Sequence, residues 1–501
     1  MDNWTDDYVT EIPYSINHFP EMAPAHLNLA LLHLGLAGPA IDKDFTYLEL
    51  GFGQGLGLNL LAATHPQGRF FGNDFMPAHV QAAQGLAALG GLTNLSLFAD
   101  SFAQLLKRDL PPMDYIVLHG VYSWVNAGNR IVIVDLLRKL LKPGGVVYIS
   151  YNCLPGWSAK APLQRLMSEF AQRQTTGTAL ERFHAARDLL VSLDAADAAF
   201  FASNPSARVA LRDITQASDA YLLHEFAPKG WSPFYHTEVA QDLAAAGLGF
   251  AGSARLFNNF PAYSLLPKTR ALLQATPDAG LRELLRDFAM QTQFRRDIFG
   301  RDVLGLTPAE RDQRTHALRI ALWRPLASCA FICHTPIGEV ELEEELYGPL
   351  LQTFSTGPRD IDTLLRLSAR LGFAASDCIA AINMLLCLGY VGIASATPLA
   401  VAGRECVHAL NRALLERLRA GQRQSGLASA ALGAAIEISY HDQLFLSAQQ
   451  AGCTNVEELT RHAIGILEAD DSSEEMQARL SREAKNFLKY GEDFYRSLDL
   501  F

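Results

Sequence analysis

Residues 47–55, with the sequence Tyr-Leu-Glu-Leu-Gly-Phe-Gly-Gln-Gly, constrain the fold of this chain more than any other stretch. A short apolar strand leads into a glycine-rich turn, and the turn opens a predicted helix over residues 56–64. In a doubly wound α/β sheet this order presents backbone amides at a helix N-terminus to a nucleotide-like ligand. The spacing of Gly51, Gly53 and Gly55 suits dinucleotides as well as S-adenosylmethionine.

Two acidic positions follow the ends of further predicted strands. Residues 69–74 are a predicted second strand that ends in Asp74. This position lies about 20 residues past the glycines, where a carboxylate can accept hydrogen bonds from ribose hydroxyls. A third predicted strand, 95–99, ends at Asp100 and Ser101, which are candidate partners of an adenine amino group. Dehydrogenases also place an acid after the second strand, so these positions do not decide between the two ligands.

The run at 140–150, Leu-Leu-Lys-Pro-Gly-Gly-Val-Val-Tyr-Ile-Ser, does discriminate between them. It follows a predicted fourth strand, 114–119, and a predicted helix, 129–140. The run resembles the helix, Pro-Gly-Gly turn and fifth strand of class I S-adenosylmethionine methyltransferases, which a dinucleotide-binding domain does not need. The resemblance implies a Rossmann-like α/β fold and S-adenosylmethionine as cofactor. The residues that it implies for cofactor binding are Glu49, Gly51, Gly53, Gly55, Asp74, Asp100 and Ser101.

Length and charge narrow the class of protein. With 501 residues the chain is too long for one hydrophobic core, so we expect several domains. The 42 Lys and Arg residues against 53 Asp and Glu residues give a net charge of -11. A general nucleic-acid binder needs a basic surface to displace phosphate counterions, so we expect no nucleic-acid partner.

The chain also lacks the usual signals for export, membrane insertion and metal binding. Its first residues are acidic and carry no apolar signal segment, and the most apolar stretch, 27–41, is broken by Gly35, Gly38 and Pro39. We therefore expect a cytoplasmic protein with no membrane partner. The 7 cysteines are an odd number. Cys329, Cys333 and His334 have no second cluster to complete a metal site, so we interpret the cysteines as buried thiols and expect no metal.

A winged-helix-like pattern lies in the C-terminal half. Residues 361–371 and 375–388 are predicted helices, and the strand-like residues 389–393 follow. The second helix would read DNA in a transcription factor, but residues 376–392 contain no Lys or Arg for phosphate contacts. We interpret this region as a packing or protein-contact module. The remainder of the chain beyond residue 310 is predicted to be nearly all helical.

Several motifs together resemble one family, the bacterial methyltransferases with a methyltransferase regulatory domain. The motifs are Tyr8-x5-Tyr14, the glycine loop, Tyr151-Asn-x-Leu-Pro-Gly-Trp, Tyr221-Leu-x-His-Glu-Phe, Trp231-x-Pro-Phe-Tyr and Phe294-Arg-Arg-Asp-Ile-Phe. The best understood members are the outer-membrane-protein lysine methyltransferases of intracellular bacteria. One segment departs from the family pattern. Residues 18–24 read His-Phe-Pro-Glu-Met-Ala-Pro, where the family tends to have Pro-Phe-Pro-Gln-Thr-His-Pro, so a different specificity follows if this segment touches the substrate.

The resemblance divides the chain into four segments. They are an N-terminal aromatic extension or lid (1–40), the cofactor-binding core (41–160), a helical linker with the regulatory domain (161–310), and a C-terminal helical, winged-helix-like domain (311–501). We expect the extension to fold over the cofactor, although packing beside the sheet is the alternative.

A lysine acceptor sets the chemical requirements of the site. Its reference pKa, about 10.4, leaves the amine protonated, so the site must desolvate and orient it. The candidate catalytic residues are Tyr14, His119, Tyr122, Tyr151 and Asn152. Trp124 and Trp157 are interpreted as packing residues. Arg295, Arg296 and Asp297 are interpreted as a solvated helix face, with an interdomain salt-bridge cluster as the alternative.

The leading interpretation is a methyltransferase for lysine side chains of a protein, with surface or outer-membrane proteins before export as candidate substrates and a homodimer as a candidate assembly. After the fourth strand the chain reads His119-Gly-Val-Tyr122 and not Asp/Asn-Pro-Pro-Tyr/Phe, which disfavours methylation of nucleic-acid bases. Two alternatives stay open. One is an O- or N-methyltransferase for a small molecule or glycan, and the other is a cofactor-binding scaffold without turnover.

Overall fold

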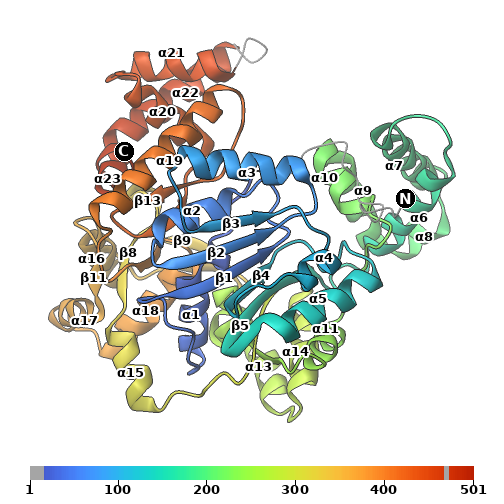
Figure 1. Cartoon of the computed structure of the whole chain (residues 1–501), viewed down its shortest axis with the longest axis horizontal. Coiled ribbons are helices and arrows are strands. Elements are labelled where there is room, and N and C mark those ends of the chain that lie inside the picture. The colour runs from blue at the N-terminus through green and yellow to red at the C-terminus, as the bar shows by residue number, and fades with distance from the viewer. Residues whose placement is uncertain (1–15, 468–472) are drawn as a thin grey trace.

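A mixed sheet of 7 strands forms the centre of the computed structural model, which describes residues 16–467 and 473–501 (Figure 1). The strand order is β3-β2-β1-β4-β5-β7-β6. Strands β1 to β5 run parallel, and β7 pairs antiparallel with both β5 and β6. The strands are β1 (Phe45–Leu50), β2 (Gly68–Asn73), β3 (Leu95–Phe98), β4 (Met113–Leu118), β5 (Leu141–Asn152), β6 (Gly249–Ser253) and β7 (Phe294–Gly300). The predicted Rossmann-like fold class is confirmed.

Helices cover both faces of the sheet, as the alternation of its apolar residues requires. Tyr47 and Tyr148 pack on one face with α1 (Pro24–His33), α2 (Leu56–Thr64) and α3 (Pro77–Leu89). Leu48 and Ile149 pack on the other face. That face is covered by α4 (Phe102–Lys107), α5 (Ala127–Leu140) and α11 (His236–Ala244). Successive residues of a strand point to opposite faces, so both faces are apolar in a sheet that is covered on both sides.

The sheet extends beyond the predicted core segment, 41–160. Its last strands, β6 and β7, come from the segment that was assigned to the linker and regulatory domain. The interpretation of Arg295, Arg296 and Asp297 as a solvated helix face is wrong, because these residues lie on β7. Arg295 and Asp297 are only 4% and 1% exposed. Their charges are buried because they neutralise one another in an ion network, which a single sequence does not reveal.

A helical module follows β5 and projects to one side of the sheet (Figure 1). It has its own apolar core, which includes Leu190, Phe201 and Leu223. Its helices are α6 (Ala161–Arg173), α7 (Ala179–Ala195), α8 (Ala199–Ser203), α9 (Pro205–Gln216) and α10 (Asp219–Phe226). The helices α12 (Pro261–Ser264), α13 (Pro267–Gln274) and α14 (Ala279–Met290) then connect β6 to β7.

The winged-helix-like region is present as predicted. Helices α17 (Ile361–Arg370) and α18 (Ala375–Cys387) stand beside a three-stranded sheet of order β11-β8-β12. The other elements of this region are α15 (Pro308–His316), β8 (Arg319–Leu322), β9 (Ile332–Thr335), β10 (Gly338–Glu341), α16 (Glu344–Phe354), β11 (Arg359–Asp360) and β12 (Val391–Ala394). The strands show that this half of the chain is less completely helical than predicted.

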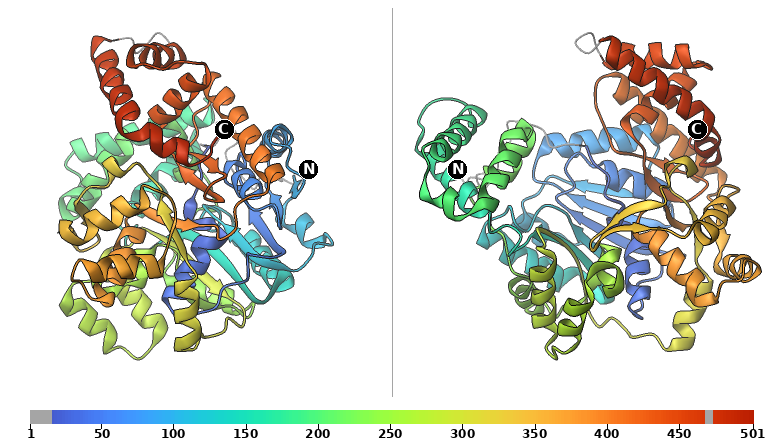
Figure 2. Two further views of the ribbon diagram at one scale, coloured as in Figure 1. Left: turned by 90° about the vertical axis from the view of Figure 1, so that its left-hand side faces the viewer. Right: turned by 180° about the vertical axis from the view of Figure 1, so that it is seen from behind.

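The last part of the chain packs back against the helices of the central sheet. Helix α19 (Val401–Arg419) lies against α2 and α3, and Arg417 donates a hydrogen bond to the Ala82 carbonyl at 3.2 Å. Figures 1 and 2 show these C-terminal helices and the α6–α10 module at opposite ends of the sheet. The remaining elements are β13 (Gly426–Ser429), β14 (Ala434–Glu437), α20 (Tyr440–Gln450), α21 (Val456–Leu467), α22 (Glu474–Asn486) and α23 (Glu492–Ser497). Among the described residues no helix combines the length and the apolar character needed to cross a membrane.

Candidate functional site

The glycine turn lies at the carboxyl end of β1 and opens α2. Gly51, Gly53 and Gly55 have φ angles of 74°, 58° and 75°, a region that favours glycine. A Cβ atom on Gly51 would lie 2.6 Å from Val121 Cγ2, and one on Gly55 would lie 2.5 Å from Ala83 Cβ. A Cβ atom on Gly53 would meet nothing within 4 Å. The turn is therefore packed at its two ends and open at its centre, where a ligand can approach the backbone.

Two buried acids border this turn. Asp74 accepts hydrogen bonds from the backbone N–H groups of Gly53, at 2.9 Å, and Met76, at 3.0 Å, so it fixes the shape of the turn. Glu49 is 8% exposed, and burial together with the nearby charge of Asp74 raises the pKa of its carboxyl to about 8. Its Oε2 atom has no hydrogen-bond partner within the described part of the chain.

These residues fit S-adenosylmethionine. The Glu49 oxygen is a buried polar atom without a partner in the described chain, the open centre of the turn leaves room for a ligand against the backbone, and Asp74 has the position expected for ribose recognition. Asp100 and Ser101 have protein partners. Asp100 pairs with Arg108, and the Ser101 hydroxyl caps α4 by accepting from the Gln104 N–H at 3.2 Å. Contact of Asp100 and Ser101 with an adenine stays a prediction.

The described end of the N-terminal extension lies over the glycine turn. Residues 16–19 and Met22 line a small cavity together with the turn, Glu49 and His119. The backbone N–H of His18 donates to the Ser425 hydroxyl at 2.6 Å, which joins this segment to the C-terminal domain. Tyr14, and Tyr8 with it, lies outside the described residues, so its proposed place beside the acceptor stays a prediction.

His119, directly after β4, is the predicted catalytic residue that the structure places at this cavity. Phe19 stacks on it with the ring centroids 3.7 Å apart and the planes at 23°. The Tyr148 hydroxyl lies 2.8 Å from its Nδ1 atom. Burial lowers the pKa of His119 to about 4, although the negative charge of Glu21 opposes the shift. The imidazole is therefore neutral near pH 7.

The structure does not bring Tyr122, Tyr151 and Asn152 to His119. The hydroxyl of Tyr122 donates to Asp242 at 2.6 Å, and that of Tyr151 donates to Asp297 at 2.6 Å. Both rings belong to the core on the α5 side of the sheet, whereas Tyr148 belongs to the core on the α1 side. The direct role expected of these tyrosines at the acceptor is therefore not supported. Strand alternation explains it, since Tyr148 and Tyr151 are an odd number of residues apart.

Asn152 instead joins the sheet to the α6–α10 module. Its side-chain amide donates to Glu225 at 2.6 Å, and the Trp231 indole N–H donates to the same oxygen at 3.1 Å. Burial raises the pKa of Glu225 to about 7. These contacts give Asn152 and Glu225 a junction role.

The structure adds site residues that the sequence analysis named only as parts of motifs and segments, and not as candidates for the site. Glu21 is close to His119 and pairs with Arg296 of β7 at 3.0 Å. Burial, the largest single influence, would raise the pKa of Glu21, but Arg296, His119, His26 and a backbone hydrogen bond together outweigh it, so the pKa is lowered. Phe294 lies edge-on to His119, with the centroids 5.5 Å apart. The departure of residues 18–24 from the family pattern was the signal that pointed to this segment.

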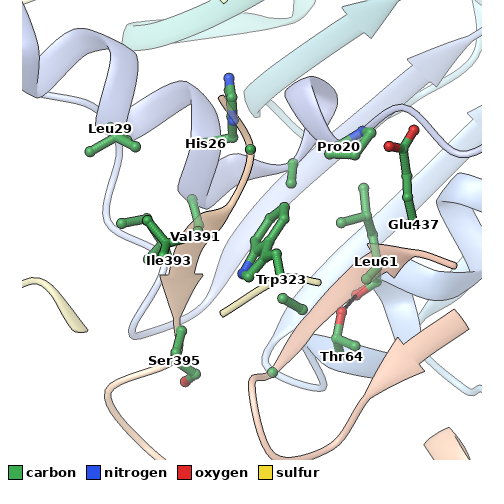
Figure 3. A pocket seen from close by; sticks show the side chains of 18 of the residues that line it. Pro20, His26, Leu29, Leu61, Thr64, Trp323, Val391, Ile393, Ser395 and Glu437 are labelled. Atoms are coloured by element: carbon green, nitrogen blue, oxygen red, sulfur yellow. Dashed lines mark hydrogen bonds between the residues drawn. The ribbon is translucent and has the colours of Figure 1, made fainter. Parts of the chain in front are cut away.

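A cavity of about 1240 Å³ lies on the other side of the same segment. Its walls come from α1, α2, Pro20 and Glu21, and from β12 and β14 of the C-terminal domain. Figure 3 shows Trp323 inside it, with Val391 and Ile393 of β12 on one side and Glu437 of β14 on the other. The central sheet with its helices and the C-terminal domain thus enclose a space next to the glycine turn.

Comparison with known proteins assigns two segments of the chain. Residues 48–147 match a family model described as a methyltransferase domain, and residues 218–301 match one described as a predicted methyltransferase regulatory domain. The chain is 36% identical over 447 residues to the uncharacterized protein sll1526 of Synechocystis sp., which covers 89% of this chain and 88% of that protein. It is 30% identical over 219 residues to the uncharacterized protein RP028 of Rickettsia prowazekii, covering 43% of this chain and 85% of that one.

A solved structure matches along the whole chain. PKMT2 from Rickettsia typhi in complex with AdoHcy superposes with a TM-score of 0.69 at 19% identity, covering 97% of this chain and 99% of that one. The fold of the sheet and of its accessory domains is thus shared. A tRNA (guanine-N(7)-)-methyltransferase of Yersinia pseudotuberculosis is 30% identical over 143 residues, which cover only 27% of this chain and 56% of that protein.

Proposed function

Because the chain belongs to the bacterial methyltransferases that carry a methyltransferase regulatory domain, it is an S-adenosylmethionine-dependent methyltransferase, and we propose that it methylates lysine side chains of a protein. The proposed setting is the cytoplasm, where surface and outer-membrane proteins are candidate substrates before export. When bound, S-adenosylmethionine supplies an electrophilic methyl group. The chain itself has to bind, desolvate and orient the nucleophile.

One observation carries the choice of a lysine. The stacked rings of Phe19 and His119 lie beside the glycine turn, and the carboxylate of Glu21, 13% exposed, lies close to His119 on the large-cavity side of the same segment. Aromatic faces and a buried carboxylate recognise an alkylammonium through cation–π and charge-assisted contacts. Desolvation lowers the pKa of a lysine amine, whereas the Glu21 carboxylate raises it, so the lysine binds as an ammonium and has to release its proton before it accepts the methyl group. The neutral imidazole of His119 adds no like charge that would repel the ammonium.

A nucleic-acid acceptor is less well supported. The match to the tRNA methyltransferase covers 27% of this chain and leaves the accessory domains without a counterpart. The net charge of -11 opposes binding to a polyanion. The similarity to PKMT2 extends over 97% of the chain, and the sequence motifs resemble lysine methyltransferases, so both favour a protein.

Label transfer tests the proposal. The purified chain is incubated with methyl-labelled S-adenosylmethionine and a bacterial lysate from which small molecules have been removed by dialysis. We expect label in one or a few protein bands, on methyl-lysine after acid hydrolysis, and loss of the label when S-adenosylhomocysteine is in excess. Label transfer that occurs only when the small molecules removed by dialysis are added back, and that leaves the protein bands unlabelled, would instead establish the small-molecule alternative. Binding of the cofactor without any transfer would establish the scaffold.

A further inference from the structure

Much of the wall of the cavity between the methyltransferase sheet and the C-terminal domain lies outside the residues that the two family models match. The models match residues 48–147 and 218–301, whereas much of the wall comes from residues 319–325, 386–400 and 424–440. At about 1240 Å³ the cavity exceeds the roughly 300–1,000 Å³ of common small-molecule pockets. Its size suits a segment of a polymer better than a small acceptor.

A single segment of chain separates this cavity from the glycine turn. Phe19 and Met22 line the space beside the turn, whereas Pro20 and Glu21 line the large cavity. Leu61 of α2 lines both spaces. A side chain that contacts Pro20 and Glu21 is therefore separated from His119 only by this segment.

The chemistry of the wall fits a peptide. Leu29, Leu61 and Ile393 supply apolar surface for side chains. Two buried donor atoms on the wall, Trp323 Nε1 and Gln424 Nε2, have no hydrogen-bond partner within the described residues. Buried donors are normally satisfied, and peptide carbonyl groups are suitable acceptors for them.

Two acidic side chains on the cavity wall supply the charge that a lysine requires. Glu21 and Glu437 both line it, and burial followed by the charge of Glu21 raises the pKa of Glu437. Arg296, which is 38% exposed at its side chain, now neutralises Glu21 and also lies 5.6 Å from the centre of the Phe294 ring. When an ammonium group replaces the Arg296 guanidinium at Glu21, the guanidinium therefore still has its contact with the Phe294 ring.

We propose that this cavity seats an extended segment of the acceptor polypeptide and that Glu21 binds its lysine as the ammonium. The ammonium then releases a proton to solvent, and the neutral amine takes the methyl group from the sulfonium, which leaves as the neutral thioether. The inference rests on the proposed function and adds to it the route and the binding site of the substrate. Glu21 acts here as a positioning residue. Its carboxylate leaves its ion pair with Arg296 and pairs with the incoming ammonium group.

Substitutions that fill the cavity test the seat. Ile393→Trp places a large ring in the cavity, and Ile332→Trp is its matched control, because Ile332 is 59% exposed and lies outside the cavity wall. The measured quantity is the initial rate of label transfer to dialysed lysate protein over a dilution series of the lysate. We expect Ile393→Trp to lower the apparent kcat/KM by about tenfold or more, the equivalent of about 1.4 kcal/mol, and Ile332→Trp to leave it unchanged. Ala434→Trp is a second filling variant should the first fail to fold.

Calorimetry with S-adenosylhomocysteine accompanies each variant. Unchanged affinity shows that the fold and the donor site are intact, so that a lost rate reports the acceptor. Glu21→Gln keeps the shape of the side chain, and we expect it to raise KM for the lysate protein while the affinity for S-adenosylhomocysteine stays the same. Transfer by folded Ile393→Trp and Ala434→Trp at the wild-type kcat/KM would overturn the inference and leave the proposed function standing. Absence of transfer by the wild-type chain would overturn both.

Discussion

Phe19 of the N-terminal segment and His119 at the end of β4 stack with their ring centroids 3.7 Å apart. This contact fixes a segment that also touches the glycine turn, the large cavity and the C-terminal domain. The carboxyl edge of the sheet provides a floor for the cofactor, and residues 16–19 cover it. The position of one aromatic ring is therefore linked to both substrates of the reaction.

Removal of that ring should affect the acceptor more than the cofactor. We expect Phe19→Ala to lower kcat about tenfold, because a stacked pair contributes about 0.5–1.5 kcal/mol and its loss also admits water beside the amine. The affinity for S-adenosylhomocysteine, measured by calorimetry, should change little. Phe288→Ala is the control, since Phe288 is 58% exposed on α14. An equal loss of cofactor affinity and turnover would show that Phe19 is part of the donor site.

Replacement of Asp74 should weaken the cofactor directly. Its carboxylate holds the Gly53 N–H and faces the expected ribose, so we expect Asp74→Ala to weaken S-adenosylmethionine binding by about 1.5–3 kcal/mol. The control is Asp109→Ala at an exposed position. Titration calorimetry with S-adenosylmethionine measures the change, and a parallel titration with NAD should show no binding. Unchanged affinity for S-adenosylmethionine would remove Asp74 from the site.

The local part of the fold could be predicted because its signals are local. Helix α2 runs over Leu56–Thr64, the range predicted from the glycine turn and the apolar residues after it. Strands β2, β3 and β4 lie within about one residue of their predicted bounds, since short apolar runs between turns define them. The glycine turn itself follows from φ angles that few other residues adopt.

The parts that could not be predicted depend on contacts between distant segments. Strand β7 pairs with β5 across the whole α6–α10 module, and its Arg295 and Asp297 are buried only because their partners lie on other elements. The acceptor side of the site also depends on contacts between segments that are distant in the sequence. Glu21 meets Arg296 through the fold, and neither residue stands in a recognisable motif for catalysis. For Tyr151, by contrast, strand alternation in the sequence already indicated the opposite face of the sheet from Tyr148.

The ion network around Arg295 should be important for stability. Its guanidinium donates to Asp287 and Asp297 at 2.8 Å, and all three residues are at most 4% exposed. Arg295→Met leaves two carboxylates without their counterion, so we expect the free energy of unfolding to fall by about 3–5 kcal/mol. Arg366→Met, at an exposed position, should change it by less than about 0.5 kcal/mol. Urea unfolding followed by circular dichroism measures both variants, and similar midpoints would contradict a structural role of the network.

The winged-helix-like region should not bind DNA. Helix α18 carries no Lys or Arg, so it cannot neutralise phosphates in a groove. We expect the full chain to give no shifted band with random-sequence duplex DNA at physiological salt in an electrophoretic assay. A complex that weakens as salt increases would mean that another surface supplies the phosphate contacts.

The buried carboxyl of Glu49 should make stability depend on pH. Burial and the charge of Asp74 raise its pKa from 4.5 to about 8 in the folded chain. Between these values the folded protein keeps the proton that the unfolded chain has released, so the unfolded state binds fewer protons and the free energy of unfolding falls as pH rises.

In the absence of cofactor this contribution should approach about 1.4 kcal/mol per pH unit within that window, and Glu49→Gln should remove it because an amide does not titrate. The two proteins are compared by urea unfolding from about pH 5 to pH 8, and the difference between their free energies of unfolding should widen in favour of Glu49→Gln as pH rises. Glu345→Gln, at an exposed position of α16, should follow the wild-type profile. Parallel profiles for the wild-type chain and Glu49→Gln would show that Glu49 is ionised at neutral pH. The acid beside the glycine turn would then meet the cofactor as a carboxylate.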